Sequence, residues 1–412
     1  MKKKLFFLVP LLLLLNTAFL FAQSKLKYLN ENKFDLRKEN ASLIKEDFKV
    51  IGFGAYHGSA KTYEAEQFLF RNLLFQNLLD YYVIEANYSQ AFFFQKFLEN
   101  NDADLLKSLC KSFQNIVSQE GTVETFNHWK ELKKTYDVKK FKVLAFDIIN
   151  EYEFPIRHIL EITNPSESWP SRKNLEQLLQ NCSDFSISNQ NLKTELNAFV
   201  IDYDENKIKY ENFIKDYASF NFVINNIKES FGKIEREKIV YRNFIDMNKK
   251  YNLDEKKLFF KYGFFHIEKD METSYPSFFT RLIKDSVYQK KDIKTIIGYL
   301  TNSEVLWKKT YIDGKYSGFK IEKGFGIGDY YKEYFQGVRK LKRTKVSDLT
   351  LFKLNNFNSP YHNGLDLIEV RGLFRKRNAY LQGKNTLNFI DYALLISGSA
   401  AQVPIEELSD VD

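Results

Sequence analysis

Cysteine is nearly absent from this sequence, which has only Cys110 and Cys182 among 412 residues. Two cysteines are too few for a disulfide framework in a chain of this length, and they do not form a metal-binding pattern. Whether they form a single bridge depends on the separation of their Cα atoms, which the sequence does not give. The composition supports a substantial buried core instead, because 44% of the residues are hydrophobic and 16% are aromatic.

Sequence motifs for three kinds of enzyme are missing too. There is no Gly-x-Ser-x-Gly segment, which argues against an ordinary serine esterase. No His-Glu-x-x-His or His-x-x-x-His segment occurs, so there is no zincin motif. Gly324-Phe-Gly-Ile-Gly328 is rich in glycine but lacks the strand-to-helix context and the spacing of a dinucleotide-binding loop. We therefore expect no cofactor.

Only one apolar run is long enough to approach a membrane span, and it lies at the N-terminus. Three lysines within the first four residues precede the largely apolar stretch Leu5–Phe21, and the small Ala22 follows. This order is typical of a secretory signal peptide. We expect residues 1–22 to be removed and residues 23–412 to be exported, to the periplasm or to the medium. The alternative is an uncleaved signal, which would be the protein's one contact with a membrane.

The positive charge of the chain is moderate and dispersed. The formal net charge is +8, and removing the three signal-peptide lysines leaves +5. The longest basic cluster, 339–345, could contact nucleic acid or an anionic surface, but a solvated helix end or loop explains it more simply. Export also argues against nucleic acid. We expect a small-molecule substrate or ligand as the partner, and the sequence does not predict an oligomeric state.

Short apolar, β-branched or aromatic runs predict buried strands. They are residues 48–55, 80–86, 141–147, 257–266, 293–300, 349–354 and 392–397. Amphipathic stretches of helical period, Thr62–Leu79 and Gln90–Leu98, lie between the early runs. Strands that alternate with helices indicate parallel strands joined by crossover helices. We therefore predict an α/β fold with a central, largely parallel sheet flanked by helices.

Residues 168–252 differ from the rest of the chain. They are charged, contain no glycine except Gly232, and repeat apolar residues at helical spacing, as in Phe213, Tyr217 and Phe220. We predict a helical insertion between the third and fourth strands of one α/β domain that comprises residues 23–412. The later segment 308–328 contains five glycines and suits hairpins or loops.

Four predicted strands end in titratable side chains. The first leads into His57, and the next three end at Glu85, Asp147 and His266. Ligand sites of open parallel sheets lie outside the carboxyl ends of the strands, so neighbouring strands would bring these side chains together. One histidine could then take a proton from water, a carboxylate could orient it, and the other histidine could protonate the leaving group. Each residue alone also has a structural interpretation, such as helix capping by Asp147.

One family shares these features. Gly52-Phe-Gly-Ala-Tyr-His57-Gly-Ser59 resembles the glycine-rich His-Gly-Ser/Thr signature that opens erythromycin esterase-like proteins. As in that family, a helix follows, and then a strand that ends at Glu85. Arg242 on a long helix, and then Tyr262-Gly-Phe-Phe-His266, are similar to the family's arginine and second histidine. The resemblance extends from about residue 50 to residue 300, and we expect it to reach the final strand near Ser397.

The resemblance implies that His57 is the general base that activates water against an ester, with Glu85, Arg242 and His266 completing the site. Arg242 also has a structural interpretation, as one partner of an ion pair on a helix surface. The wider superfamily includes metal-dependent membrane-associated proteases and iron- or haem-binding lipoproteins, so the fold by itself does not imply one chemistry.

The sequence departs from the family pattern at two positions. The family usually has a glutamate three residues before the first histidine, where this chain has Gly54. The basic residue expected nine places after that histidine is Glu66. Loss of a carboxylate beside the base would weaken its orientation, although Glu64 or Glu66 could substitute from the following helix. We therefore take Glu64, Glu66 and Asp147 as candidate substrate-binding residues.

Three functions follow as hypotheses. The first is an exported, metal-independent hydrolase of a carboxylic ester or lactone, in which a histidine activates water. The second is a non-catalytic exported protein that binds a small ligand or a surface partner through a degenerate site, as the loss of the family glutamate suggests. The third is a metal-dependent hydrolase or metal-binding protein with His57, Glu85 and His266 as ligands.

Overall fold

The computed structural model describes residues 24–38, 43–113, 117, 119–233, 235–313, 315–324, 326–372, 376 and 378–408. The expected signal peptide, residues 1–22, lies outside the described residues. The chain forms two compact units. Unit 1 comprises Met1–Leu78, Tyr262–Trp307 and Lys320–Ala401, and unit 2 comprises Leu79–Lys261, Lys308–Phe319 and Gln402–Asp412.

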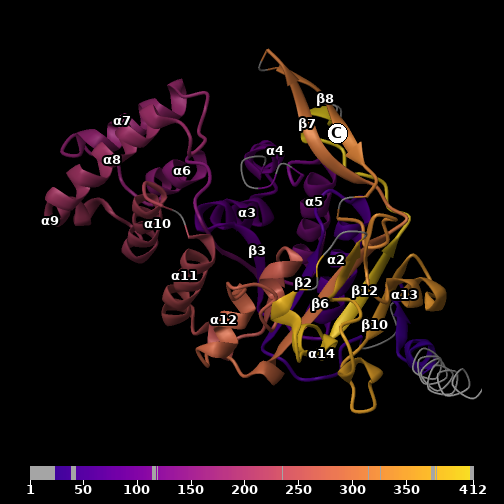
Figure 1. The fold of residues 1–412 in the computed structure, drawn as a ribbon. Coiled ribbons are helices and arrows are strands. Elements are labelled where there is room, and N and C mark those ends of the chain that lie inside the picture. The colour runs from indigo at the N-terminus through magenta and orange to yellow at the C-terminus, as the bar shows by residue number, and fades with distance from the viewer. Residues whose placement is uncertain are drawn as a thin grey trace, which may run out of the picture. The chain divides into compact units, whose positions relative to one another are not determined.

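Unit 1 contains five strands of a largely parallel sheet, in the order β1-β10-β12-β6-β2. Figure 1 labels four of them, β10, β12, β6 and β2. The three strands β12, β6 and β2 run parallel, and β1 and β10 pair antiparallel at one edge. The strands are β1 (Lys33–Asp35), β2 (Val50–Ala55), β6 (Ile293–Thr301), β10 (Leu349–Lys353) and β12 (Tyr392–Ser397). The other elements are α2 (Ala60–Phe75), the 3-10 turn η4 (Phe264–Ile267), α12 (Phe278–Lys284), α13 (Val338–Thr344), α14 (Thr386–Phe389) and the small pair β9 (Glu333–Phe335) and β11 (Val370–Gly372).

The parallel strands of unit 1 are buried along nearly their whole length. Every residue of β2 and β12 is buried, as are seven of the nine residues of β6. Strands covered on both faces consist of continuous apolar residues, and this is the pattern by which the sequence predicted them. The carboxyl ends of these three strands are therefore fixed by a rigid core.

Unit 2 contains three parallel strands in the order β5-β3-β4. They are β3 (Tyr81–Asn87), β4 (Lys142–Asp147) and β5 (Leu258–Lys261), with α3 (Tyr88–Asn100), α4 (Ala103–Ser112) and α5 (Val123–Val138) between β3 and β4. Asn87 ends β3 and begins α3 in a capping box, since its side chain accepts from Gln90 N at 3.0 Å and Gln90 Oε1 accepts from Asn87 N at 3.1 Å. The last residue of β3 is therefore held by the first turn of α3.

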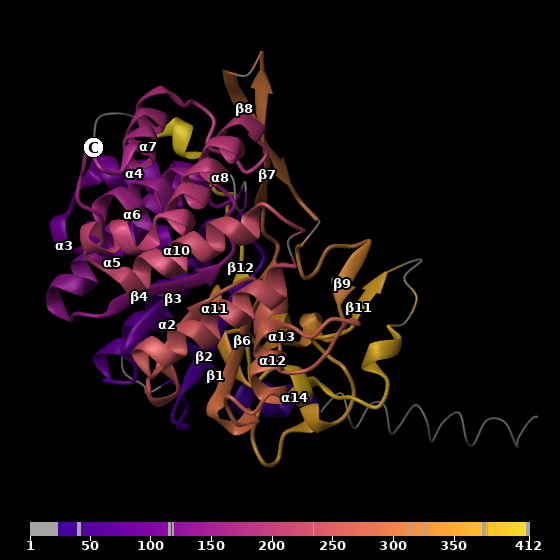
Figure 2. The ribbon, with the colours of Figure 1, turned by 90° about the vertical axis from the view of Figure 1, so that its left-hand side faces the viewer.

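A helical cluster with its own core lies between β4 and β5 in the chain (Figure 2). Its helices are α6 (Glu153–Glu161), α7 (Pro170–Asn181), α8 (Gln190–Glu205), α9 (Lys207–Tyr210) and α10 (Tyr217–Ser230), and α11 (Arg236–Tyr251) follows and packs on β4. Trp169 is fully buried and stacks on Tyr210 and Phe199, with ring centroids 4.6 and 5.8 Å apart. Of the aromatic residues that repeat at helical spacing in the sequence, Phe220 lies in this core and Phe213 packs against it, whereas Tyr217 is exposed.

These observations confirm an α/β fold with largely parallel strands, flanking helices and a helical insertion between the third and fourth predicted strands. One predicted strand was wrong in its extent. The run 257–266 is strand only over Leu258–Lys261, and His266 lies in the turn η4. A continuous apolar run does not distinguish a strand from a buried turn, and the aromatic residues after Lys261 are apolar because that turn packs against β2.

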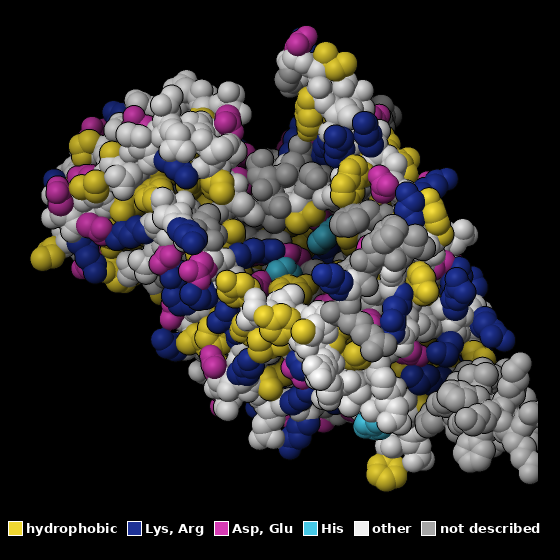
Figure 3. Space-filling model, in the orientation of Figure 1, with side chains coloured by type: hydrophobic (Ala, Val, Ile, Leu, Met, Phe, Trp, Pro, Cys, Tyr) yellow, Lys and Arg dark blue, Asp and Glu magenta, His cyan; other side chains and the backbone are white. Residues whose placement is uncertain are grey.

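The segment predicted to form hairpins or loops contains a hairpin of β7 (Val305–Ile312) and β8 (Lys315–Glu322). Among the described residues, no helix is long and apolar enough to cross a membrane. On the face shown in Figure 3, Asp and Glu side chains are scattered among Lys and Arg side chains.

Candidate functional site

His57 lies in a tight turn directly after β2 and is partly exposed. Gly58 has φ +88°, a conformation that side chains other than hydrogen rarely adopt. A Cβ at this position would lie 2.6 Å from the carbonyl oxygen of Leu306. The carbonyl of Gly58 in turn accepts a hydrogen bond of 2.8 Å from Leu306 N. Glycine is therefore required after His57 because the turn lies directly against the backbone that follows β6.

Ser59 holds the other side of the same turn. Its side chain is fully buried and donates to Ser399 Oγ at 2.7 Å. Ser399 N donates to Ser303 Oγ at 3.1 Å, and Ala60 N donates to the carbonyl of Ala400 at 3.0 Å. The segments after β6 and β12 thus fix the turn after β2, all within unit 1. The Gly-Ser pair of the family signature positions the histidine that precedes it.

His266 lies in a segment that packs on the same strand. Tyr262 N donates to the carbonyl of Phe53 at 3.3 Å, and η4 contacts β2. Like His57, His266 is partly exposed. A Cβ on Gly54 would lie 2.7 Å from Phe264 Cα, so the two backbones are in direct contact at this position. Unit 1 therefore places the segments that carry the two histidines against each other.

The contact at Gly54 explains why this chain has no glutamate at that position. A backbone atom cannot move aside as the end of a side chain can, so any larger residue must displace η4. We expect Gly54→Ala to lower the free energy of unfolding by about 1–3 kcal/mol, the usual cost of overpacking. Gly232→Ala is the matched control, because its Cβ would meet nothing closer than 3.8 Å. Urea denaturation of both variants measures the difference, and equal stability would contradict the close packing.

The backbone just after His266 is held by a buried ion pair. Lys269 Nζ lies 2.6 Å from Asp391 Oδ2, and the two side chains are 3% and 1% exposed. Asp391 Oδ2 also accepts from Thr295 N at 2.9 Å, and Thr295 Oγ1 donates to the carbonyl of Ile267 at 2.8 Å. These contacts fix the exit of the His266 turn on strand β6.

The two helix glutamates of α2 have different environments. Glu64 forms an ion pair of 2.7 Å with Arg37, which also pairs with Asp348. Glu66 is fully buried. Glu64 is therefore part of a surface charge network, and Glu66 is part of the interior of unit 1.

In unit 2, the carboxyl ends of β3 and β4 converge on one arginine. Arg236 Nη2 donates to Glu85 Oε1 at 2.6 Å and also to Asp147 Oδ2, and its Nε donates to Asp147 Oδ1 at 2.9 Å. The side chains of Glu85 and Asp147 are only 7% and 1% exposed, and that of Arg236 is 33% exposed. Burial alone would lower the pKa of the guanidinium, but the adjacent Asp147 and Glu85 carboxylates raise it, so Arg236 stays charged.

Sequence reasoning missed Arg236 and named Arg242, six residues later on the same helix. Arg242 lies in an ion pair of 2.6 Å with Glu229, and both side chains are more than 40% exposed. Arg236 is the first residue of α11, where the helix begins beside the ends of β3 and β4. The available signal was position in the helix, because an arginine at a helix start is unusual and suggests a carboxylate partner.

A further carboxyl group, that of Glu151, lies in the segment after β4 and is 1% exposed. Burial, with a smaller contribution from the charge of Glu153, raises the pKa of Glu151 to about 8. The folded protein therefore keeps a proton that the unfolded chain releases near its ordinary pKa of 4.5.

Stability should consequently fall as the pH rises through this interval. Between about pH 5 and pH 8 we expect Glu151 to lower the free energy of unfolding by up to about 1.4 kcal/mol per pH unit. Glu151→Gln should remove this slope and make the variant more stable than the wild type at pH 8. Urea denaturation across that range measures both, and parallel pH profiles would show that Glu151 is ionised in the folded protein.

Both cysteines are free, and Cys110 is buried while Cys182 is partly exposed. Among the described residues, no three His, Cys, Asp or Glu side chains are arranged to hold a metal ion.

Three solved structures share this fold over most of their length. A Bacillus cereus protein superposes with a TM-score of 0.62 at 15% identity, covering 93% of this chain and 99% of that one. A succinoglycan biosynthesis protein gives 0.62 at 10% identity, with 92% and 98% covered. A mutant of the erythromycin esterase EreC in its open conformation gives 0.56 at 11% identity, with 87% and 92% covered.

The chain has an erythromycin esterase-like fold. No family model matches it, and no curated protein matches it in sequence. At these identities the likeness establishes the fold and not the chemistry, which depends on the side chains present. Unit 1 carries His57, His266, Glu64 and Glu66, and unit 2 carries Glu85, Asp147, Arg242 and Arg236.

Proposed function

We propose that this protein is an exported hydrolase that cleaves a carboxylic ester or lactone, with His57 as the general base that activates water. The observation that carries the proposal is the His57 turn. It follows a buried parallel strand, is fixed by hydrogen bonds from two neighbouring strand ends, and leaves the imidazole partly exposed. A histidine held in this way can take a proton from water without reorganising the surrounding chain.

His266 is the second imidazole of unit 1, and we assign it the role of protonating the leaving group or stabilising developing charge. In unit 2, Arg236 is the side chain that we propose for binding an anionic group. Its guanidinium is fixed by two buried carboxylates and keeps one third of its surface exposed, so it can donate to a negatively charged oxygen. Glu85 and Asp147 act as positioning residues through Arg236.

Hydrolysis of a panel of esters and lactones, with and without a chelator, tests the proposal. We expect turnover that survives the chelator and is lost in a His57 variant. Loss of turnover on chelation would replace the proposal with the metal-dependent alternative. Absence of turnover across the panel, from protein that is folded by circular dichroism, would contradict catalysis.

The presence of glycine at position 54 favours one other function, which is binding of a small ligand without cleavage. The backbone contact with Phe264 leaves no room for the carboxylate that the family signature has at this position. A base without that carboxylate is less well oriented. Ligand binding without turnover, unaffected by His57→Gln, would support this function over hydrolysis.

We also propose export through the N-terminal signal. N-terminal sequencing of the protein recovered from a secreting host should begin at Gln23. A mature protein that keeps its first residues and is recovered from the membrane fraction would support the uncleaved signal instead.

A further inference from the structure

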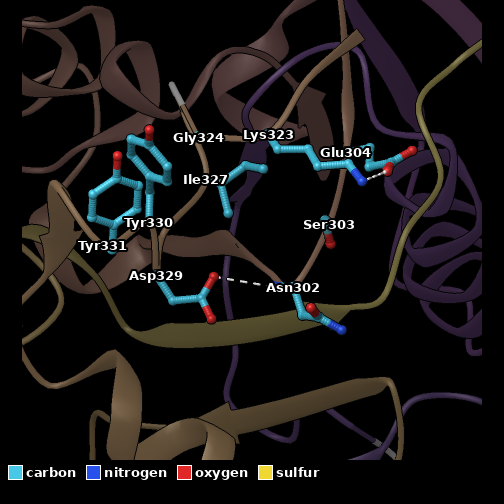
Figure 4. Close-up of a pocket in the computed structure, with 9 residues that line it drawn as sticks. All are labelled: Asn302, Ser303, Glu304, Lys323, Gly324, Ile327, Asp329, Tyr330 and Tyr331. Carbon is cyan, nitrogen blue, oxygen red and sulfur yellow. Dashed lines mark hydrogen bonds and ion pairs between the residues drawn. The ribbon is translucent and has the colours of Figure 1, made fainter.

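Unit 1 contains a polar pocket that none of the preceding roles uses (Figure 4). It has a volume of about 290 Å³ and is formed by two segments, the one that follows β6 and the one between β8 and β9. Its size is at the lower limit for small-molecule sites, so it fits one ring-sized group and not a large molecule.

The glycine-rich segment singled out in the sequence builds one wall of this pocket. A Cβ on Gly324 would meet three atoms of the Tyr330 ring at 2.8–2.9 Å, so the ring packs flat on the glycine. Gly326 supports Tyr56 in the same way, with ring atoms 2.4 Å from its ideal Cβ position. Tyr56 is the residue before His57. The same segment therefore shapes the pocket and supports the turn that carries the candidate base.

The pocket has an aromatic side and a polar side. Tyr330 and Tyr331 stand together with ring centroids 4.6 Å apart, and Tyr331 is 76% exposed (Figure 4). Glu304 lies across from them in an ion pair of 2.6 Å with Lys323. Asp329 accepts from Asn302 N at 3.1 Å.

The charges of the lining cancel. Lys323 is paired with Glu304, and Asp329 is paired with Lys342. A site that binds a cation or an anion usually has one uncompensated charge of the opposite sign. Here both charged pairs are internally neutralised. What remains are tyrosine faces and groups that both donate and accept hydrogen bonds, such as the side-chain amide of Asn302. A neutral, polyhydroxylated ring matches this combination, because its C–H face packs on an aromatic ring and its hydroxyls both donate and accept.

The pocket also lies beside the His57 turn. Ser303 lines the pocket, and its Oγ accepts a hydrogen bond from Ser399 N. The hydroxyl of Ser399 in turn accepts a hydrogen bond from the hydroxyl of Ser59. Asn302 and Ser303 directly follow β6, the parallel neighbour of β2, at the end where ligand sites of such sheets lie.

We propose that this pocket is a subsite for a neutral glycosyl group of the ligand. The assignment of that ligand as the substrate rests on the proposed function, but binding of the glycosyl group does not require hydrolysis.

Saturation-transfer NMR with methyl glucopyranoside, methyl galactopyranoside and methyl rhamnopyranoside tests the subsite on the full mature protein. We expect at least one glycoside to bind, and Tyr330→Ala and Tyr331→Ala each to weaken it about tenfold, through loss of an aromatic contact. Tyr331 is exposed, so its replacement does not disturb the core. Tyr275→Ala, which removes a tyrosine that is 68% exposed outside the pocket, should leave binding unchanged.

Three results would overturn the inference. They are no binding of any glycoside, binding that neither tyrosine variant weakens, and tighter binding of tetramethylammonium than of the glycosides. Glycoside binding by a protein that hydrolyses no ester would leave the subsite in place and remove only the proposed function. Ester hydrolysis without glycoside binding would support the proposed function and remove the subsite.

Discussion

Replacement of His57 by glutamine should lower kcat for ester or lactone hydrolysis by about 10²- to 10⁴-fold, the usual contribution of a general base. Glutamine can fill the position of the imidazole but cannot take a proton from water at neutral pH. The hydrogen bonds that hold the turn come from Gly58 and Ser59, so the fold should be retained. Steady-state kinetics with the best ester of the panel measures the loss.

His362→Gln is the control for this experiment. His362 is an exposed histidine in a short 3-10 turn of the same unit, and its replacement should leave kcat within the error of the assay. Wild-type activity in the His57 variant, with the fold intact by circular dichroism, would contradict the assignment of His57 as the base. An equal loss in both variants would point to a nonspecific effect of histidine replacement.

Replacement of Arg236 by methionine should lower the free energy of unfolding at pH 7 by about 3–5 kcal/mol. Methionine keeps the apolar stem of the side chain and removes its charge. The Glu85 and Asp147 carboxylates then remain buried without a cation, and this is the costly half of a broken buried ion pair.

Arg242→Met provides a matched control on the same helix. Its ion pair with Glu229 is exposed to water on both sides, and such pairs contribute at most about 1 kcal/mol. Urea denaturation of the two variants should separate them clearly. Equal destabilisation would show that the carboxylates of β3 and β4 do not depend on Arg236.

The strands were the most predictable part of the fold. The predicted strand 392–397 has the observed limits of β12, and the strand predicted at 141–147 differs from β4 by one residue. Buried parallel strands are short apolar runs between polar turns, and this contrast is visible in a single sequence. The strand β1 was missed because Lys33–Asp35 is a three-residue edge strand with two charged residues, which has no such contrast.

The candidate site was less predictable because its partners are far apart in sequence. The pairing of Arg236 with Glu85 joins residues 151 positions apart, and no local pattern encodes it. The glycine at position 54 could be noticed as a departure from the family, but its cause lies in the backbone of Phe264, more than 200 residues later. The pocket beside the glycine-rich segment was likewise hidden, because its lining comes from two separate segments.

The hydrogen bonds around the His57 turn have a consequence for how activity would be lost. The turn is held by the start of β7, which follows β6 in the chain, and by the segment after β12, and β6 and β12 are interior strands of the sheet of unit 1. The conformational entropy of the turn is therefore lost when unit 1 folds, and a ligand finds the imidazole already oriented. Gentle warming should then leave catalytic geometry intact until the unit melts cooperatively, so that inactivation and unfolding coincide in temperature.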